Sequence, residues 1–342
     1  MMAFSARIAQ RALAGRYLFL LCLWCGVVAA PACRSLEASP GQRHVIAADS
    51  EWKEWDVLDT KRGLPVQLDR WIESLSGYDI VYVGEEHHNH SHIEAALKIL
   101  RSLVDRGRHP TLALEMFGWD GQEALNRYAG GGYDQADRTA FVTQSRWTQN
   151  WGGSLEDYAP LLDFAREHHL IVRAMNPPKS LIRSVVKKGI AGVRGEPEWS
   201  RWGLDRETIV DDPLYREKIL EQLQQCHGGG APEDYETMYQ ASMVRDEAMA
   251  KTLAEAWEST REDGTTRGPI VSYTGGGHIQ YKLPVPKRVA RRLADHVKQI
   301  TVYLTSFDPA RKAEISESMN EGIADYVWLT PLGPQGPPRR CR

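Results

Sequence analysis

The stretch DIVYVGEEHHNH, residues 79–90, indicates the fold class of this chain. Its apolar part, Ile80–Val83, is short, contains β-branched residues and ends at Gly84, which is typical of a buried strand. A capping-box pattern at Ser91–Glu94 then predicts a helix, whose apolar residues recur at helical spacing until Gly107. A buried strand followed by an amphipathic helix is the repeating unit of parallel sheets.

The same alternation continues to residue 330. Further strands are predicted at 111–116, 170–175, 269–273, 299–304 and 326–329, and helices at 154–168, 179–188 and 234–259. Residues 190–233 are rich in Gly, Pro and charge, which indicates an insertion with one or two helices. We therefore expect an α/β domain over 71–330, with a mostly parallel sheet covered by helices on both faces and a helical insertion. Residues 33–70 are expected to form a leader or linker, and residues 331–342 a disordered tail.

Length and composition exclude several classes of protein. The chain has 342 residues, of which 42% are apolar and 25% charged, so it can bury a sizeable core. This excludes an intrinsically disordered chain and a small disulfide scaffold. The 42 basic and 45 acidic residues give a net charge of -3, and this balance predicts no binding to nucleic acid.

The N-terminus has the pattern of an export signal, expected over residues 1–32. Three arginines and no acid precede the apolar run Tyr17–Ala30, whose 14 residues span about 21 Å as a helix, less than the roughly 30 Å hydrocarbon core of a bilayer. The run ends in the small-x-small cleavage pattern Ala30–Ala32, with an uncleaved anchor as the alternative. Cys33 follows directly and is the candidate lipidation site, which would tether an exported, periplasmic protein to the membrane of the cell envelope. Cys226 and Cys341 would survive processing and allow one disulfide.

Polar side chains gather just after the predicted strands. The first strand is followed by a cluster of acids and histidines over 85–92, and Glu115 lies at the end of the second strand. Asn176 follows the third strand, and three glycines and His278 follow the fourth. Parallel strands bring their carboxyl ends to one edge of the sheet, where ligands bind in such folds. We therefore expect these side chains to converge.

Two Gly-x-x-His motifs, Gly84–His87 and Gly275–His278, stand at the ends of two predicted strands. The glycine lets the backbone turn sharply off the sheet edge, so that the histidine can point back over the sheet. The two imidazoles, together with the carboxylates of Glu85 and Glu115, would form a metal site or an acid–base site. A single motif of this kind is more often an ordinary strand-to-helix turn, but two copies at equivalent strand ends favour a site.

Other polar residues have a structural and a functional interpretation. Glu115 lies in a strand that looks buried, so it either belongs to a site or forms a structural salt bridge. Arg245 lies on an apolar helical stripe and needs an acidic partner or an anionic ligand group; its neighbour Asp246 could instead belong to a local network. His88 and His90 are expected to be solvated loop residues.

The motifs together resemble the ChaN-like haem-binding uptake family of the Tiki/TraB superfamily. The resemblance rests on pieces that occur in order over about 80–290: Gly84–Asn89 with His92, Leu114–Phe117, Trp151, Tyr158–Leu162, Ala165, Ala174, Asn176–Pro177, Arg245–Ala250, Gly275–His278 and Pro286–Arg288. The superfamily pattern implies one site made of both Gly-x-x-His motifs, a Glu and an Arg, which here are His87, His278, Glu115 and Arg245, with Glu85 beside them. The chain departs from the family at residue 88, in the residues before the candidate lipidation site and in its insertion.

The resemblance implies an exported haem-binding protein, lipid-anchored through Cys33, that takes part in iron or haem uptake. Haem needs an apolar slot, an axial ligand and cations for its propionates. The expected cofactor-binding residues are Glu85, His87, Tyr158, Arg245 and His278, with Tyr158 or His87 as the axial ligand. The expected partner is haem or another small molecule, and a homodimer is compatible with the sequence.

The alternative is a hydrolase, because other branches of the superfamily are metal-dependent peptidases or erythromycin-esterase-type enzymes. In that case His87, Glu115, His278 and Arg245 would be catalytic. A divalent metal ion, held by Glu85, His87, Glu115 and His278, would activate a water molecule.

Overall fold

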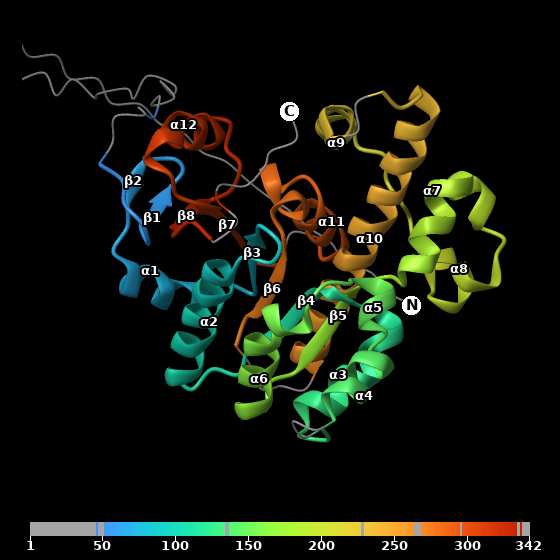
Figure 1. Ribbon diagram of the computed structural model, residues 1–342, viewed down its shortest axis with the longest axis horizontal. Helices are drawn as coiled ribbons and strands as arrows, with labels where there is room; N and C mark the ends of the chain where they lie inside the picture. The colour runs from blue at the N-terminus through green and yellow to red at the C-terminus, as the bar shows by residue number, and fades with distance from the viewer. Residues whose placement is uncertain are drawn as a thin grey trace, which may run out of the picture. The chain divides into compact units, whose positions relative to one another are not determined.

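The computed structural model describes residues 46, 51–133, 137–226, 229–262, 268–294, 296–333 and 336. Within these residues, eight strands form one sheet in the order β2-β1-β8-β7-β3-β6-β4-β5 (Figure 1). The strands are β1 Val57–Asp59, β2 Leu64–Pro65, β3 Ile80–Glu85, β4 Thr111–Gly118, β5 Val172–Asn176, β6 Ile270–Gly275, β7 Gln299–Ser306 and β8 Tyr326–Thr330. The predicted export signal, Cys33 and most of the predicted tail lie outside the described residues.

The centre of the sheet is parallel, as the strand–helix alternation predicts. Strand β3 pairs in parallel with β6 and β7, β4 pairs in parallel with β5 and β6, and β7 with β8. Only β1 runs antiparallel, to β2 and β8, among the described strands. Every residue of β3, β4 and β6 is buried, because helices cover both faces of the sheet. Strands that are buried on both faces are typically near-continuous apolar runs, as these are.

Twelve α-helices surround the sheet in the described residues. They are α1 Leu68–Ser74, α2 His90–Asp105, α3 Gln122–Ala129, α4 Arg138–Gln144, α5 Trp147–Asn150, α6 Ala159–Glu167, α7 Lys179–Val193, α8 Pro197–Arg201, α9 Pro213–Cys226, α10 Pro232–Glu262, α11 Val285–Arg292 and α12 Lys312–Asn320. Helices α2 and α6 cover one face, with Leu100 and Leu161 in its core; α10 and α11 cover the other, with Leu253 and Val289 (Figure 1). The α/β fold with helices on both faces is therefore confirmed.

Two local expectations differ from the structure. The segment expected as a leader contributes β1 and β2 to the sheet, and strands of three and two residues are too short to produce an alternating pattern. Helix α2 begins one residue earlier than the capping box predicts: Asn89 is the N-cap, and its side chain accepts a hydrogen bond from the Ser91 N–H at 3.0 Å. His88 still precedes the helix, as expected.

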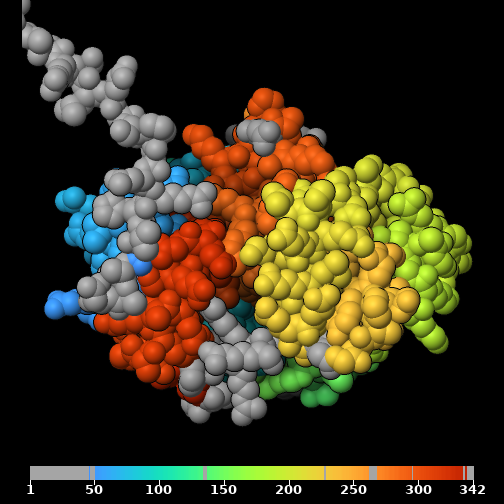
Figure 2. Space-filling model, turned by 90° about the horizontal axis from the view of Figure 1, so that it is seen from above, coloured from blue at the N-terminus to red at the C-terminus, as the bar shows by residue number. Residues whose placement is uncertain are grey.

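The predicted insertion over 190–233 contains the end of α7, helices α8 and α9 and the start of α10. Seen from above in Figure 2, α9 in yellow and α12 in red face each other across a hollow of about 420 Å³. Cys226, at the end of α9, is disulfide-bonded, and Cys341 lies outside the described residues. Among the helices that the structure describes, none is both long and apolar enough to span a bilayer.

Candidate functional site

The first Gly-x-x-His motif places an imidazole on a buried carboxylate. Glu85 is the last residue of β3 and is 4% exposed, whereas the side chain of His87 is 43% exposed. The Nδ1 of His87 lies 2.8 Å from Oε1 of Glu85. The hydroxyls of Tyr158 and Tyr273 also donate to Glu85, at 2.9 and 2.7 Å. Three hydrogen bonds thus compensate the desolvation of this carboxylate, and they orient the ring of His87 so that Nε2 is directed away from Glu85.

The second motif places His278 between two carboxylates. Its Nδ1 lies 2.5 Å from Oδ1 of Asp246 in α10, and its Nε2 lies 3.1 Å from Oε1 of Glu115 in β4. Glu115 follows Leu114, where the register of β4 against β5 shifts, and such irregularities redirect side chains at sheet edges. The backbone carbonyl that this leaves without a ladder partner accepts a hydrogen bond from the Asn176 side chain at 2.6 Å.

Gly275 brings the two motifs together. Its N–H donates to Oε2 of Glu115 at 2.6 Å. A Cβ added to Gly275 would lie 2.7 Å from Cε1 of His87 and 3.4 Å from Oε2 of Glu115, so only glycine allows this approach. The predicted meeting of His87, Glu115 and His278 at the carboxyl ends of β3, β4 and β6 is therefore confirmed, because these three strands are neighbours in the sheet.

The proximity of acids and imidazoles controls the protonation of the site. Burial opposes the charge on His278, but the carboxylates of Glu115 and Asp246 outweigh it and raise the pKa of His278 to about 10. Burial alone would raise the pKa of Glu115, but the charge of His278 and its hydrogen bond bring that pKa well below the ordinary value. His278 is therefore a cation at neutral pH, and it donates a hydrogen bond to each carboxylate.

The pair formed by Glu85 and His87 also retains a proton strongly. Burial opposes the charge on His87, but the hydrogen bond to Glu85 and the negative charge of Glu115 raise the pKa of His87 above its ordinary value. Burial raises the pKa of Glu85 as well, against the opposing hydrogen bonds from His87 and the two tyrosines.

A cavity of about 330 Å³ opens beside this cluster. Its lining includes His87, Glu115, Trp151, Lys179 and Arg245. The rings of His87 and Trp151 meet edge to face, with centroids 4.7 Å apart. Apolar side chains of three further residues complete the wall: Met116, Pro177 and Ile182.

Several polar groups at the wall of this cavity have no partner in the described residues. Within the described residues, the half-buried guanidinium of Arg245 and the ammonium of Lys179 have no carboxylate partner. The buried Nε1 of Trp151 and Oδ1 of Asn176 have no hydrogen-bond partner in that part of the chain either. Buried polar atoms are normally hydrogen-bonded, and half-buried cations normally find an anion. Asp246 does belong to a local network, as one interpretation of the sequence had it, but its partners are His278 and Tyr215.

Tyr158, an expected site residue, and His88, an expected solvated loop residue, both differ from expectation. Tyr158 is fully buried, and its hydroxyl donates to Glu85 and accepts from the His88 N–H, so it supports Glu85 instead of offering an axial oxygen to the cavity. His88 is not a solvated loop residue: its Nδ1 lies 2.7 Å from Oδ2 of Asp157, and its ring lines the cavity. Asp246 was not among the expected site residues, although its position beside Arg245 on one helix was visible in the sequence.

The expected four-residue metal site is not formed as such. Over the described ranges, no group of three or more His, Cys, Asp or Glu side chains is arranged to hold a metal ion. The carboxylates of Glu85 and Glu115 are instead occupied by the histidines and by hydrogen-bond donors of the protein.

Comparison with known families agrees with this geometry. Residues 71–289 match the profile of the family described as haem-binding uptake, Tiki superfamily, ChaN. The chain belongs to this family. The match covers all three strands that carry the site and the helix that carries Arg245 and Asp246.

Individual relatives show the shared fold. The structure of ChaN of Campylobacter jejuni, described as showing cofacial haem binding, superposes with a TM-score of 0.61 at 16% identity, over 81% of this chain and 96% of that chain. Protein RETICULATA-RELATED 5, chloroplastic, of Arabidopsis thaliana is 27% identical over 279 residues, which are 77% of this chain. The chain spans 35% of the length of that protein. An erythromycin esterase, EreC, superposes with a TM-score of only 0.41 over 74% of this chain and 76% of that chain, at 14% identity, which carries no argument about function.

Proposed function

We propose that this protein binds haem at the cavity beside His87, as a component of iron or haem uptake. The observation that carries the proposal is a cavity-lining imidazole, with its side chain 43% exposed, whose Nδ1 is held by a buried carboxylate. Histidines that ligate metals almost always make such a second hydrogen bond, which orients the ring and raises its basicity. His87 is therefore our candidate axial ligand, and bound haem would supply the iron chemistry.

The cations of the cavity suit the propionates of haem, and its apolar wall suits the porphyrin. Propionates are anionic, and Arg245 and Lys179 provide two cations without a carboxylate partner in the described residues. The apolar wall and the Trp151 ring suit the porphyrin.

His88 is a second candidate ligand. Its Nδ1 is held by Asp157, as that of His87 is held by Glu85, and it lines the same cavity. The two histidines are adjacent in the chain, and adjacent side chains of an extended backbone point to opposite sides. His88 has a left-handed backbone with φ of 63°, and both imidazoles line the same cavity.

Titration of the purified protein with hemin tests the proposal. We expect a saturable shift of the Soret band that is lost, or weakened about tenfold or more, in His87→Ala. His90→Ala is the matched control, because His90 is 66% exposed and is not among the residues of the cavity wall. His88→Ala shows whether the second imidazole contributes. Absence of a Soret shift, or an unchanged spectrum in both His87→Ala and His88→Ala, would contradict the proposal.

The cationic groups have their own test. Arg245→Gln is expected to weaken binding of hemin but to leave binding of hemin dimethyl ester unchanged, since the ester carries no propionate charge. If Arg245→Gln weakens the binding of hemin and of its dimethyl ester equally, Arg245 acts through the fold and not through the propionates.

The hydrolase alternative has less support. A metal-dependent hydrolase needs an ion at the site. The described residues contain no group of three or more His, Cys, Asp or Glu side chains arranged to hold one.

We further propose that the chain is exported and anchored through a lipid on Cys33. The support is the sequence pattern at its N-terminus and the family, whose description concerns uptake. Detergent phase partitioning of the protein from its native envelope, compared with Cys33→Ser, tests the anchor. Partitioning of both forms into the aqueous phase would contradict it.

A further inference from the structure

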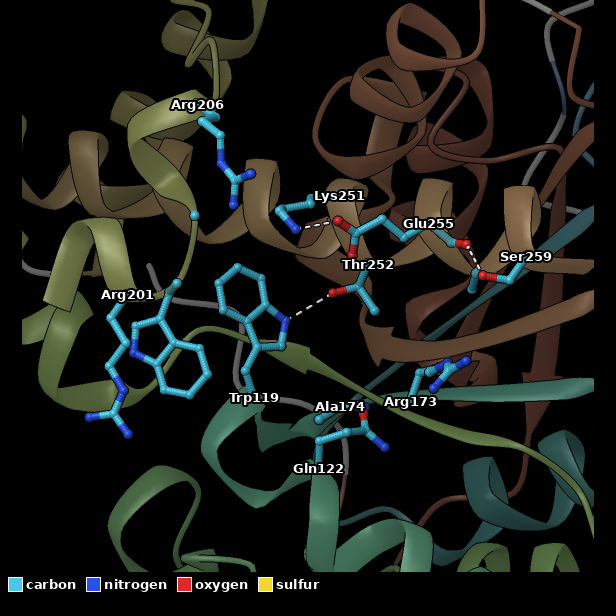
Figure 3. Close-up of a pocket in the computed structure, with 13 residues that line it drawn as sticks. Trp119, Gln122, Arg173, Ala174, Arg201, Arg206, Lys251, Thr252, Glu255 and Ser259 are labelled. Carbon is cyan, nitrogen blue, oxygen red and sulfur yellow. Dashed lines mark hydrogen bonds and ion pairs between the residues drawn. The ribbon is translucent and has the colours of Figure 1, made fainter.

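A second cavity, of about 480 Å³, lies beyond β5 at the edge of the sheet (Figure 3). It is lined by the turn after β4 and the first residue of α3, by the edge strand β5, by the end of the short helix α8 with the turn after it, and by the C-terminal half of α10. The residues that argue for its use are Trp119, Trp202, Arg173, Arg206, Lys251 and Glu255. It shares no lining residue with the cavity beside His87, and the proposed haem site does not involve it.

Two indole rings form its apolar wall and are held in place. Trp119 and Trp202 lie with centroids 6.0 Å apart and planes inclined by 41°. The Nε1 of Trp119 donates to Thr252 at 2.9 Å, and the Nε1 of Trp202 donates to Glu198 at 3.0 Å. Both N–H groups are occupied, which holds the rings in place. The Arg201 guanidinium lies 5.3 Å from the centroid of the Trp202 ring and the Lys251 ammonium 5.8 Å from that of the Trp119 ring, so a ligand would stack on the opposite faces.

The charged groups of the cavity are mostly cationic. Four basic side chains line it, Arg173, Arg201, Arg206 and Lys251, against one carboxylate, Glu255. Lys251 pairs with Glu255, and Arg201 lies 3.1 Å from Glu198. Arg173 and Arg206 have no carboxylate or hydrogen-bond partner in the part of the chain that the structure describes. Figure 3 shows Arg206 extending toward the Trp119 ring and Lys251, whereas the guanidinium of Arg201 points away from Trp119.

The edge strand beside the cavity is already covered. The Gln122 side chain donates to the carbonyl of Val172 at 2.9 Å and accepts from the N–H of Ala174 at 2.7 Å. These are the outward-facing backbone groups of β5 that an added peptide strand would need. The cavity therefore suits a compact ligand and not an extended peptide.

The lining also differs from that of a haem site. It contains none of the usual axial ligands, His, Tyr, Cys or Met. Its volume lies in the range of small-molecule pockets. We propose that this cavity binds a planar aromatic carboxylate, with the ring on the indoles of Trp119 and Trp202 and the acidic group on the guanidinium of Arg206, supported by Arg173.

Isothermal titration of the full-length protein with 2-naphthoate tests the proposal, with neutral 2-naphthamide as the matched ligand. We expect saturable binding of one naphthoate per chain and much weaker binding of the amide. Arg206→Gln should weaken naphthoate binding about tenfold, since a hydrogen bond to a charged group is lost. Trp202→Leu should weaken it as well, through the loss of stacking. Arg206 is exposed, so its replacement leaves the fold intact.

Arg101→Gln is the control, because Arg101 is exposed on α2 and lines neither cavity. We expect its affinity to stay within about twofold of the unchanged protein. His87→Ala should leave naphthoate binding unchanged even if it abolishes hemin binding, so failure of this proposal and failure of the haem proposal are distinguishable. Absence of saturable binding, equal affinity for the amide, equal effects of Arg101→Gln and Arg206→Gln, or loss of binding in His87→Ala would each overturn the inference.

Discussion

Replacing Asp246 by Asn removes one of the two negative charges that hold His278 as a cation, while an amide oxygen remains to accept its hydrogen bond. Burial opposes the charge on His278, yet Glu115 and Asp246 raise its pKa to about 10 from 6.5, which corresponds to about 5 kcal/mol of added stabilisation of the imidazolium. If the two carboxylates share this stabilisation equally, the variant loses about 2–3 kcal/mol at neutral pH, at the lower end of the cost of breaking a buried pair, because Glu115 remains as a partner.

The pH dependence has a definite sign. A group whose pKa is raised by folding contributes stability that is complete below its unfolded pKa, here about 6.5, and that is lost as the pH rises through the folded pKa, here about 10. The unchanged protein should therefore lose stability between these two values. The difference between it and Asp246→Asn should be largest near pH 6 and should shrink as the pH rises through about 10, above which His278 is neutral in both proteins.

Two measurements check this reasoning. Thermal unfolding followed by far-UV circular dichroism at a series of pH values gives the stability difference. NMR of 13Cε1-labelled histidines gives the pKa of His278, which should fall by about one to three units in Asp246→Asn. A His278 that titrates near 6.5 in the unchanged protein, or a stability difference that does not depend on pH, would refute the argument.

Three further substitutions have expected outcomes. Glu85→Gln should lower the pKa of His87 toward its ordinary value, measured by NMR, and weaken hemin binding about 10- to 100-fold, because the ring loses its orienting carboxylate; an unchanged pKa would contradict the pairing. Gly275→Ala places a Cβ 2.7 Å from His87, so it should lower the free energy of unfolding by about 1–3 kcal/mol and weaken hemin binding. The control Gly277→Ala meets nothing closer than 3.9 Å and should change neither quantity. Equal melting temperatures for the two variants would contradict the tight approach at Gly275. Tyr158→Phe should cost about 1–3 kcal/mol, since a buried acceptor on Glu85 loses a donor, but should retain the Soret shift of hemin; loss of that shift would restore Tyr158 as the axial ligand.

The central part of the site could be predicted from local patterns combined with one topological rule. Each Gly-x-x-His motif ends an apolar, β-branched run, so its strand is recognisable without other information. The rule that parallel strands end at one edge then places His87, Glu115 and His278 together, although up to 191 residues separate them in the chain. The structure has them in contact because β6 lies between β3 and β4.

Other features depend on partners that no local pattern contains. Tyr158 looked like an available phenol, but its hydroxyl meets a carboxylate 73 residues away. Asp246 has the same residue type as many solvated acids, and only the packing of α10 against the end of β6 directs it to His278. The covered edge of β5 could not be predicted either, because the side chain of a single helical residue, Gln122, makes both hydrogen bonds to the backbone of β5.

The N-cap of α2 also differs from the one that the sequence pattern predicts. Both Asn89 and Ser91 are good N-caps, and the difference between them is small. Asn89 additionally donates to the Ser306 hydroxyl at 2.9 Å, so a tertiary contact decides between two locally similar starts.

The contact between Tyr215 and Asp246 gives the insertion a part in the chemistry of the sheet edge. The Tyr215 hydroxyl, on the inner side of α9, donates to Oδ2 of Asp246 at 2.5 Å, while the other oxygen of that carboxylate holds His278. A loosening of α9, whether by heat, by proteolysis or by a molecule that binds to it, would withdraw that donor and leave a buried carboxylate to rearrange around the imidazole. The position of α9 and the protonation of His278 are thus coupled through the Asp246 carboxylate.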